Sequence, residues 1–259
     1  MNLSIIVLNY NFLECTKQTV ENLIKLTTVP HEFIFVDNGS IDGTRKYLES
    51  MRDKTNAQQV KYVFNDRNLG VAGGKNSGLQ VAEGNYLLTI DDDILVPSNY
   101  DKLMTEALDK IDTLGTIGVN VEGKNYGVVN INDVAIRLKK WGNIGGGCVC
   151  MSRRIFNMVG YLSADTVYGG EDCDLYNRLR LLNLMNGYIV PKGQHLTKSA
   201  SDSYKAIKAA AHKSTSIEHQ KVRVNKYKYK KKTKPIFVEC STPKLDTKKI
   251  DEAIKVKPK

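Results

Sequence analysis

Continuous apolar runs alternate with segments of helical periodicity along the first part of the chain. Apolar runs of strand length occupy residues 3–9, 31–36, 60–64 and 86–90. Residues 11–26 and 41–51 lie between them and place apolar side chains at helical spacing. Strand and helix in alternation predict an α/β fold with a doubly wound, mostly parallel sheet and helices on both faces. Open sheets of this kind bind ligands at the carboxyl ends of their strands.

The pattern beyond residue 97 continues the same fold less regularly. We expect helices over residues 98–111, 153–159 and 176–182, and strands over residues 115–121, 126–131, 148–151 and 186–190. Ser152 is placed to cap the helix that follows it. Three glycines, Gly145 to Gly147, precede one of these strands, and their lack of side chains lets another molecule or backbone come close.

The apolar run that ends at Ile90 is followed at once by three carboxylates, Asp91, Asp92 and Asp93. Their mutual repulsion costs free energy unless a cation or a set of hydrogen-bond donors compensates it. Side chains alternate along an extended segment, so Asp91 and Asp93 can converge on one ion while Asp92 faces elsewhere. Hard oxygen ligands suit Mg²⁺ or Mn²⁺. An acidic turn in which Asp92 or Asp93 caps the next helix is the alternative interpretation.

Polar residues also follow the three earlier strands. They are Asn9, Asp37, and Arg67 with Asn68. Loops after consecutive strands converge on one crevice in such sheets, as nucleotide sites do. The glycine-rich segment 70–78 is predicted as a loop whose backbone approaches a phosphate, with Lys75 adding charge. It matches neither common phosphate-binding glycine pattern, and a tight turn is the alternative.

A second acidic cluster, Glu171 and Asp172, follows two glycines and leads into a helical segment. Acidic side chains are common in the first turn of a helix because they oppose the positive end of its dipole. The preceding glycines favour a second interpretation, in which a flexible loop brings an acid to the sheet edge as a general base. His195 ends the predicted folded part and is either a metal ligand or a structural histidine.

Charge divides the 259 residues into two regions, although the whole chain has a formal net charge of +10. Residues 196–259 hold 18 basic and 6 acidic side chains, a balance of +12, whereas residues 1–195 hold 20 and 22, a balance of −2. We therefore predict a folded domain over residues 1–195 and a basic C-terminal extension over residues 196–259, helical at first and then flexible.

Composition disfavours several classes of protein. No segment approaches roughly 18 uncharged apolar residues, which argues against a membrane span. The first residues have neither a basic leader nor a small-residue cleavage site, so we expect a cytoplasmic protein. The five scattered cysteines argue against a disulfide framework, and Cys148 and Cys150 are expected to be buried small hydrophobes rather than zinc ligands.

The order of these features resembles the inverting nucleotide-sugar glycosyltransferases of the GT-A fold, especially the large family two. The resemblance covers residues 2–195 and rests on five motifs in the family's order. They are Ser-Ile-Ile-Val-Leu-Asn-Tyr at residues 4–10, Val-Asp-Asn-Gly-Ser at residues 36–40 with Asp42, Gly43 and Thr44, Asn68-x-Gly70 with Asn76-x-Gly78, Asp91-x-Asp93, and Gly-Gly-Glu-Asp-x-Asp-Leu at residues 169–175. Three contiguous Asp residues depart from the family's usual pattern, which leaves open which two would bind metal.

The resemblance implies a metal-dependent inverting glycosyltransferase that uses a nucleoside diphosphate sugar, with UDP as the expected nucleotide and Mn²⁺ or Mg²⁺ as the cofactor. It implies that Asp37 hydrogen-bonds the base, and the implied donor-site residues are Asn9, Tyr10, Asp37, Asn38, Arg67, Asn68, Lys75, Asp91 and Asp92. Asp91 and Asp93 would hold the metal, with His195 resembling a third ligand found in some members. Asp172 matches the catalytic base and Glu171 the neighbouring acid on the acceptor side. The acceptor would be a hydroxyl of a glycan, a lipid-linked molecule or a protein.

Two other functions are weighed against this one. A nucleotidyltransferase would also bind nucleotide and metal, but the second acidic cluster would then lack a clear task. A non-catalytic nucleic-acid-binding protein would act through the basic extension, and the −2 balance of residues 1–195 speaks against it. The extension itself is solvated, lies on an anionic membrane that carries the acceptor, or contacts nucleic acid, the last being the least favoured.

Overall fold

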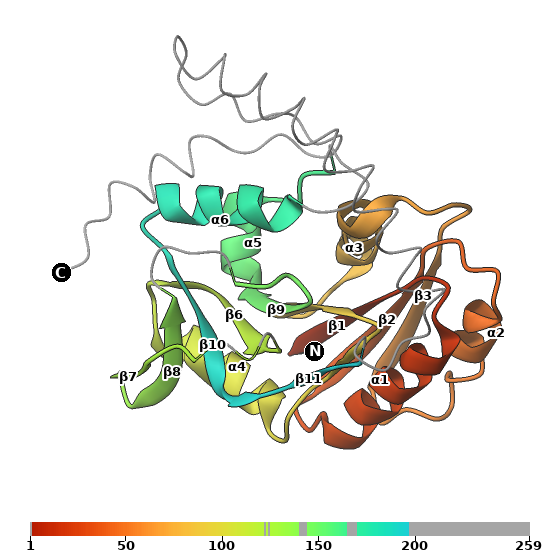
Figure 1. Cartoon of the computed structure of the whole chain (residues 1–259), viewed down its shortest axis with the longest axis horizontal. Helices are drawn as coiled ribbons and strands as arrows, with labels where there is room; N and C mark the ends of the chain where they lie inside the picture. The colour runs from red at the N-terminus through yellow and green to blue at the C-terminus, as the bar shows by residue number, and fades with distance from the viewer. Residues whose placement is uncertain (1, 122, 124, 140–143, 165–169, 197–259) are drawn as a thin grey trace, which may run out of the picture.

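The computed structural model describes residues 2–121, 123, 125–139, 144–164 and 170–196 (Figure 1). A nine-stranded sheet in the order β3-β2-β1-β4-β9-β6-β10-β8-β7 forms its centre, and β11 and β5 form a separate pair. The strands are β1 (Leu3–Asn9), β2 (His31–Asp37), β3 (Gln59–Phe64), β4 (Tyr86–Asp91), β5 (Ile94–Leu95), β6 (Leu114–Asn120), β7 (Val128–Ile131), β8 (Val134–Lys139), β9 (Cys148–Ser152), β10 (Met185–Lys192) and β11 (Gln194–His195). The helices are α1 (Leu13–Leu26), α2 (Thr44–Glu49), α3 (Gly70–Val81), α4 (Tyr100–Lys110), α5 (Arg153–Val159) and α6 (Glu171–Leu181). Our predictions for the basic extension lie outside the described residues, apart from Leu196.

Most strands of the large sheet point the same way. Strands β3, β2, β1 and β4 are parallel neighbours. Strand β9 is antiparallel to both β4 and β6, so β6 returns to the common direction, and β10 pairs with it in parallel. Strand β8 runs against β10 and is followed by the antiparallel β7. Only β8 and β9 therefore oppose the common direction among the described strands, and the predicted mostly parallel α/β fold is confirmed.

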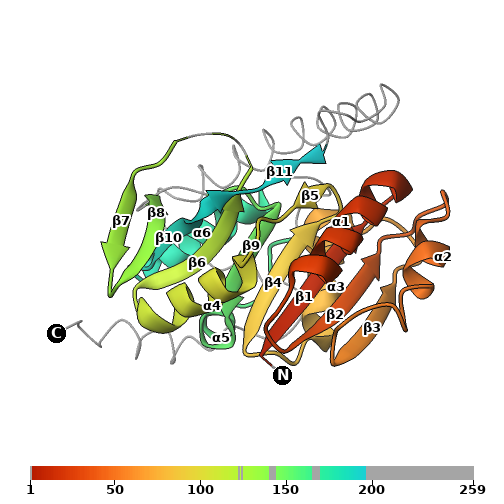
Figure 2. The same cartoon turned by 90° about the horizontal axis from the view of Figure 1, so that it is seen from below.

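Helices cover both faces of this sheet (Figures 1 and 2). One core cluster packs β1 side chains such as Ile5 against Leu23 of α1, Leu48 of α2 and Met104 of α4. The other packs Ile6 of β1 against α3, α5 and α6. Strands β1 and β2 are buried on both faces, and their central residues, 5–8 and 33–36, are accordingly all apolar.

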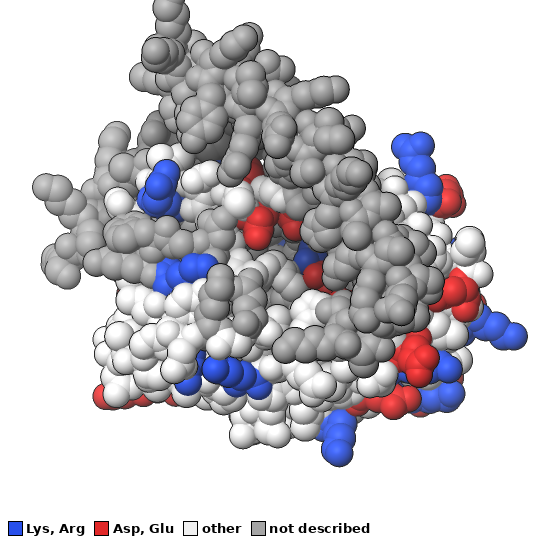
Figure 3. Space-filling view, in the orientation of Figure 1, with Lys and Arg blue, Asp and Glu red and all other residues white. Residues whose placement is uncertain are grey.

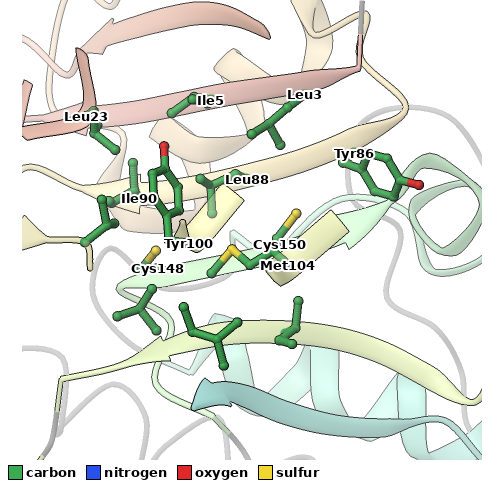
Figure 4. Close-up of a cluster of buried hydrophobic side chains, with 14 of the residues drawn as sticks. Leu3, Ile5, Leu23, Tyr86, Leu88, Ile90, Tyr100, Met104, Cys148 and Cys150 are labelled. Atoms are coloured by element: carbon green, nitrogen blue, oxygen red, sulfur yellow. The ribbon is translucent and has the colours of Figure 1, made fainter. Parts of the chain in front are cut away.

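The two cysteines of β9 lie inside the first cluster, beside Leu88, Tyr100 and Met104 (Figure 4). Burial raises the pKa of the Cys148 thiol to about 12, which keeps it protonated and unsuited to metal binding. The prediction that Cys148 and Cys150 are buried small hydrophobes is confirmed. No helix among the described residues has the length and apolar character needed to cross a membrane.

The prediction of a glycine-rich loop over residues 70–78 was wrong, because these residues form most of α3. A Cβ added at Gly74 would lie 2.4 Å from Leu8 Cδ1, and one at Gly78 would lie 2.4 Å from Ile6 Cγ2. The glycines therefore serve close packing of α3 on β1 rather than backbone approach to a phosphate.

Strands β5, β8 and β11 were not predicted, and several helix boundaries differ from those predicted. Strand β8 was missed, although the Asn132-Asp133 turn before it, with φ of 49° and 64°, is a hairpin signal. Helix α4 begins at Tyr100 after Asn99, and α6 begins at Glu171 rather than Tyr176. The predicted cap of α5 is present, since Ser152 Oγ accepts from the Ile155 amide at 3.3 Å.

A buried charge network holds the amino-terminal edge of the sheet. Glu32 is fully buried and accepts from Ser4 Oγ at 2.6 Å and from the Glu83 amide at 2.7 Å. Lys61 Nζ lies 2.8 Å from the other Glu32 oxygen and 2.9 Å from Glu83. Burial alone would raise the pKa of Glu32, but Lys61 and Ser4 outweigh burial and lower it. This network ties β1, β2, β3 and the connection from α3 to β4 together at the edge opposite the strand ends.

We expect Glu32→Gln to lower the free energy of unfolding by about 1.5–3 kcal/mol, the contribution of hydrogen bonds to a charged group. Because the folded-state pKa of Glu32 is lowered, its contribution is complete above the ordinary value of 4.5 and is lost as the pH falls through the folded-state pKa. Urea unfolding from pH 7 to pH 3 should therefore show the difference between wild type and variant narrowing below about pH 4.5. Glu49→Gln, which alters an exposed ion pair, is the control, and equal effects of the two substitutions would contradict the prediction.

Candidate functional site

The carboxyl ends of β1, β2, β3 and β4 lie side by side at one edge of the large sheet. The parallel register pairs Asn9 with Asp37 and Leu8 with Asp91. The Asn38 amide then donates to Asn9 O at 2.9 Å, which continues the pairing into the loops. The structure thus brings the polar strand ends together, as the alternation of strand and helix predicts.

Asn9 and Asp37 are buried at the first two strand ends. The Asn9 side-chain amide donates to the β2 backbone at 3.0 Å, and its Oδ1 is buried with no hydrogen-bond partner among the described residues. The Asp37 carboxylate accepts from the Ser40 amide at 3.2 Å. Gly39, with φ of +83°, makes the turn after β2, and a Cβ there would lie 2.8 Å from the carbonyl carbon of Arg67. The loop after β2 consequently packs directly on the loop after β3.

Asn38 ties the end of β2 to the start of α3. Its side-chain nitrogen donates to Asn68 Oδ1 at 2.9 Å, and its Oδ1 accepts from the Leu69 amide at 3.1 Å. Arg67 and Asn68 are exposed, and Tyr10 is 37% exposed. Among the predicted donor-site residues, Asn38 is therefore a buried structural connector, whereas Arg67, Asn68 and Tyr10 are open at the sheet edge.

The three carboxylates at the end of β4 contact three different partners. These contacts are Asp91 with Lys75 Nζ at 2.8 Å, Asp92 with the Tyr10 amide at 3.1 Å, and Asp93 with His195 Nε2 at 3.8 Å. The N-cap of α4 is Asn99, so the interpretation of Asp92 or Asp93 as a helix cap is wrong. Dividing the three charges among separate partners reduces the repulsion that their adjacency creates.

Asp92 accepts hydrogen bonds from other residues of the protein. Its side chain is buried and accepts from Thr16 Oγ1 at 3.1 Å, while its backbone oxygen accepts from Thr19 Oγ1 at 2.9 Å. Burial and the adjacent Asp93 raise the pKa of Asp92 well above its ordinary range. We did not predict Thr16 or Thr19 as site residues, although both lie on the buried stripe of α1, where an apolar residue would be expected.

Lys75 is the central cation of the site. It lies in α3, is only 2% exposed, and donates to Gly146 O at 2.9 Å in addition to its ion pair with Asp91. Burial alone would lower the pKa of Lys75, but Asp91 outweighs burial and raises it, so the ammonium stays charged. Lys75 therefore links α3, the end of β4 and the glycine segment before β9.

The second acidic cluster lies against that glycine segment. A Cβ added at Gly146 would be 3.7 Å from Asp172 Cβ and 3.9 Å from Glu171 Oε1. Burial raises the pKa of Glu171, an effect that Lys75 opposes. Asp172 is partly exposed, and its Oδ1 accepts from the Cys173 amide at 2.7 Å at the start of α6. Figure 3 shows acidic side chains around a hollow in this face of the molecule.

Asp93 and His195 meet because β11 pairs with β5, where His195 is opposite Ile94. The Leu196 amide donates to Asp93 O at 2.8 Å and holds the chain in this place. No three His, Cys, Asp or Glu side chains are grouped closely enough in the described part of the chain to hold a metal alone. Mg²⁺ and Mn²⁺ are commonly held by one or two carboxylates together with substrate phosphates, so an Asp93 and His195 pair fits such an ion.

A comparison with known proteins finds a family whose model matches this chain. A family model described as glycosyl transferase family 2 matches residues 4–160. The glycosyltransferase GlyG of Streptococcus pneumoniae serotype 4 is 28% identical over 116 residues, which cover 45% of this chain and 38% of that protein. The matched region therefore spans well under half the length of such relatives.

Solved structures agree on the fold. The mannosyltransferase PcManGT from Pyrobaculum calidifontis, in complex with GDP-Man and Mn²⁺, superposes with a TM-score of 0.57 at 19% identity, over 74% of this chain and 55% of that one. GalNAc-T7 with UDP, GalNAc and Mn²⁺ gives 0.60 at 17% identity, over 75% of this chain and 44% of that one. At such low identity the likeness shows the fold alone, and it confirms the predicted GT-A type.

We expect Lys75 and Asp91 to be strongly coupled in stability. Lys75→Met leaves Asp91 among other carboxylates without its cation, so adding Asp91→Asn should restore part of the lost stability. A double-mutant cycle measured by urea unfolding should give a coupling free energy of about 0.5–3 kcal/mol. The same cycle at the exposed Arg45 and Glu49 pair should give no measurable coupling. Additive effects at Lys75 and Asp91 would refute the role given to this ion pair.

Proposed function

The chain belongs to glycosyl transferase family 2, and on that premise we propose that it transfers a sugar from a nucleoside diphosphate sugar to an acceptor hydroxyl, with inversion and with a divalent metal. The family match covers residues 4–160, whereas Glu171, Asp172 and His195 lie beyond it. Their roles therefore rest on the geometry of the site and on the sequence motifs.

The proposal rests on one observation. Two acidic clusters that are far apart in the sequence lie near the same buried lysine. Asp91 at the end of β4 and Glu171 at the start of α6 both interact with the buried ammonium of Lys75. Gly146, whose carbonyl Lys75 holds, lies beside Asp172. One cluster adjoins the strand ends where a nucleotide would bind, and the other faces it across a segment without side chains. A donor sugar between them would have carboxylates on both sides.

The strand ends supply groups suited to the nucleoside. Asp37 is a buried carboxylate that can accept from the N–H of a base. Asn9 holds the neighbouring strand end, and its Oδ1 has no hydrogen-bond partner within the described part of the chain. Tyr10, Arg67 and Asn68 are exposed beside them, where they can contact the ribose and the phosphates. We retain Asp37 as the base-binding residue of this proposal.

The metal would be held by Asp93 and His195, completed by oxygens of the diphosphate. Asp91 remains the second candidate carboxylate, and its ion pair with Lys75 offsets part of its charge. When bound, Mn²⁺ or Mg²⁺ supplies a Lewis acid for the charge that develops on the departing nucleoside diphosphate. Asp92 is engaged with Tyr10 and α1, so its part in donor binding would be to hold the Tyr10 backbone in place.

The chain's own groups would then perform the proton transfer. Asp172 would accept the proton of the acceptor hydroxyl as that oxygen attacks the anomeric carbon from the side opposite the leaving group, which inverts the configuration. Glu171, whose pKa is raised by burial, lies next to it and can hydrogen-bond the acceptor. Lys75 would limit the repulsion between the acids while keeping its own proton.

Several finer features remain part of the proposal. The structural neighbours are bound to UDP and to GDP-Man, so UDP stays our expected nucleotide with GDP as the rival. The family match favours glycosyl transfer over nucleotidyl transfer and over nucleic-acid binding. The acceptor, a cytoplasmic location and contact with an anionic membrane stay predictions.

Asp172→Asn should reduce turnover by about 10²–10⁴-fold while leaving donor binding intact, because it removes the general base and preserves the shape of the side chain. The donor is first identified by a thermal-shift screen of nucleotide sugars with and without Mn²⁺. Turnover is then measured as release of the nucleoside diphosphate. Asp53→Asn, which changes an exposed carboxylate in the turn after α2, is the control. Full activity of Asp172→Asn would reject Asp172 as the base.

Asp93→Ala should abolish the increase in nucleotide affinity that Mn²⁺ produces, because the ion loses its carboxylate ligand. Calorimetric titration with UDP and with GDP, each with and without Mn²⁺, measures this directly. A metal-dependent affinity equal to that of the wild type would remove Asp93 from the proposed metal site. His195→Ala, tested in the same way, reports whether the imidazole contributes.

A further inference from the structure

Asn76, in the interior of α3, makes a paired contact with the backbone of a residue 86 positions away. Its side-chain nitrogen donates to Leu162 O at 2.8 Å, and its Oδ1 accepts from the Leu162 amide at 3.0 Å. Asn76 is 7% exposed and both hydrogen bonds are buried. Neither the nucleotide site nor the acidic clusters use this side chain.

The contact explains an otherwise unfavourable residue. Asparagine has low helix propensity, and a buried amide must satisfy both its donor and its acceptor. A carboxamide has an N–H donor and a C=O acceptor side by side. It can therefore pair with both the C=O and the N–H of one residue, as a neighbouring β-strand does. Leucine or alanine at position 76 would leave the peptide of Leu162 without these partners.

Leu162 lies in residues 160–164, the described stretch that follows α5. Val159 is the last residue of α5, and its carbonyl accepts from the Arg178 guanidinium of α6. Asn76 thus ties residues 160–164 to α3, and Arg178 ties the end of α5 to α6. The same helix α3 carries Lys75, which holds Gly146 beside Glu171 and Asp172.

We propose that Asn76 is a positioning residue, which sets the place of Glu171 and Asp172 relative to the donor site by holding Leu162, three residues beyond Val159, the α5 residue to which Arg178 ties α6. This inference rests on the proposed function, because it assigns the acids a task in transfer. Two consecutive residues of one helix, Lys75 and Asn76, then hold Gly146, which lies against the acids, and Leu162, which leads back to α5. Close packing of α3 on β1 transmits this placement to the strand ends.

Asn76→Ala should lower kcat by about 10–100-fold, the size of effect expected when reacting groups are displaced by about 1 Å, with little change in the donor KM or in nucleotide affinity with Mn²⁺. The matched control is Ser4→Ala. Ser4 Oγ likewise donates one buried hydrogen bond and accepts another, to Glu32 and from Gly84, at the opposite edge of the sheet. Ser4→Ala should lower the melting temperature comparably and leave kcat unchanged. An unchanged kcat in folded Asn76→Ala, or an equal loss in Ser4→Ala, would overturn the inference.

Amide hydrogen exchange gives a second readout that needs no turnover. In Asn76→Ala, exchange should rise in peptides from Gly160 to Ser163 and from Glu171 to Leu182, and stay unchanged in β1 and β2. Unchanged exchange in these peptides would overturn the inference.

If the wild type turns over no nucleotide sugar, the proposed function fails, and hydrogen exchange alone decides whether Asn76 holds residues 160–164. Should Asn76→Ala not fold, Asn76→Asp, which keeps the acceptor and loses the donor, replaces it.

Discussion

A buried ammonium group is the constraint on which the rest of this site depends. Lys75 is almost fully enclosed, and the cost of removing its charge from water is several kcal/mol unless oxygens surround it. Asp91 and the Gly146 carbonyl are those oxygens, and they come from the end of β4 and the segment before β9. Satisfying one cation therefore fixes three segments that are distant in the sequence. The acids of α6 are placed by the same requirement, because they lie against Gly146.

The glycines of α3 make this arrangement sterically possible. Side chains at Gly74 or Gly78 would overlap Leu8 and Ile6, and α3 would then have to move away from β1. A shift of that kind would draw Lys75 away from Asp91 and Asn76 away from Leu162. Close packing and buried polar contacts therefore depend on each other in α3. Van der Waals contact with β1 sets the position of the helix, and Lys75 and Asn76 then bind the segments around it.

The two edges of the sheet differ in how far their acidic side chains are neutralised by basic ones. At the amino-terminal edge, Glu32 is surrounded by donors and by Lys61, so its charge is fully compensated within the protein. At the carboxyl edge, the described residues form two ion pairs between an acidic side chain and a Lys or Arg. Lys75 pairs with Asp91, and Arg178 pairs with Asp174. The carboxyl edge consequently retains negative charge, which suits the binding of a cation and a diphosphate in our proposal.

The sequence by itself determined the fold class and the order of most of its strands and helices. Strand centres buried on both faces, as in β1 and β2, consist of consecutive apolar side chains, and that pattern is visible without coordinates. It also showed which residue types follow each strand, because Asn9, Asp37 and Asp91 occur where apolar runs stop. Only the tertiary structure decided what those side chains contact. The local pattern of residues 70–78 predicts a phosphate loop, because it does not distinguish a glycine that bends the chain from one that admits a neighbouring strand. The partnerships of Lys75 with Gly146, Asn76 with Leu162 and Asp93 with His195 join positions far apart in the chain, and such contacts depend on packing geometry that no local periodicity encodes.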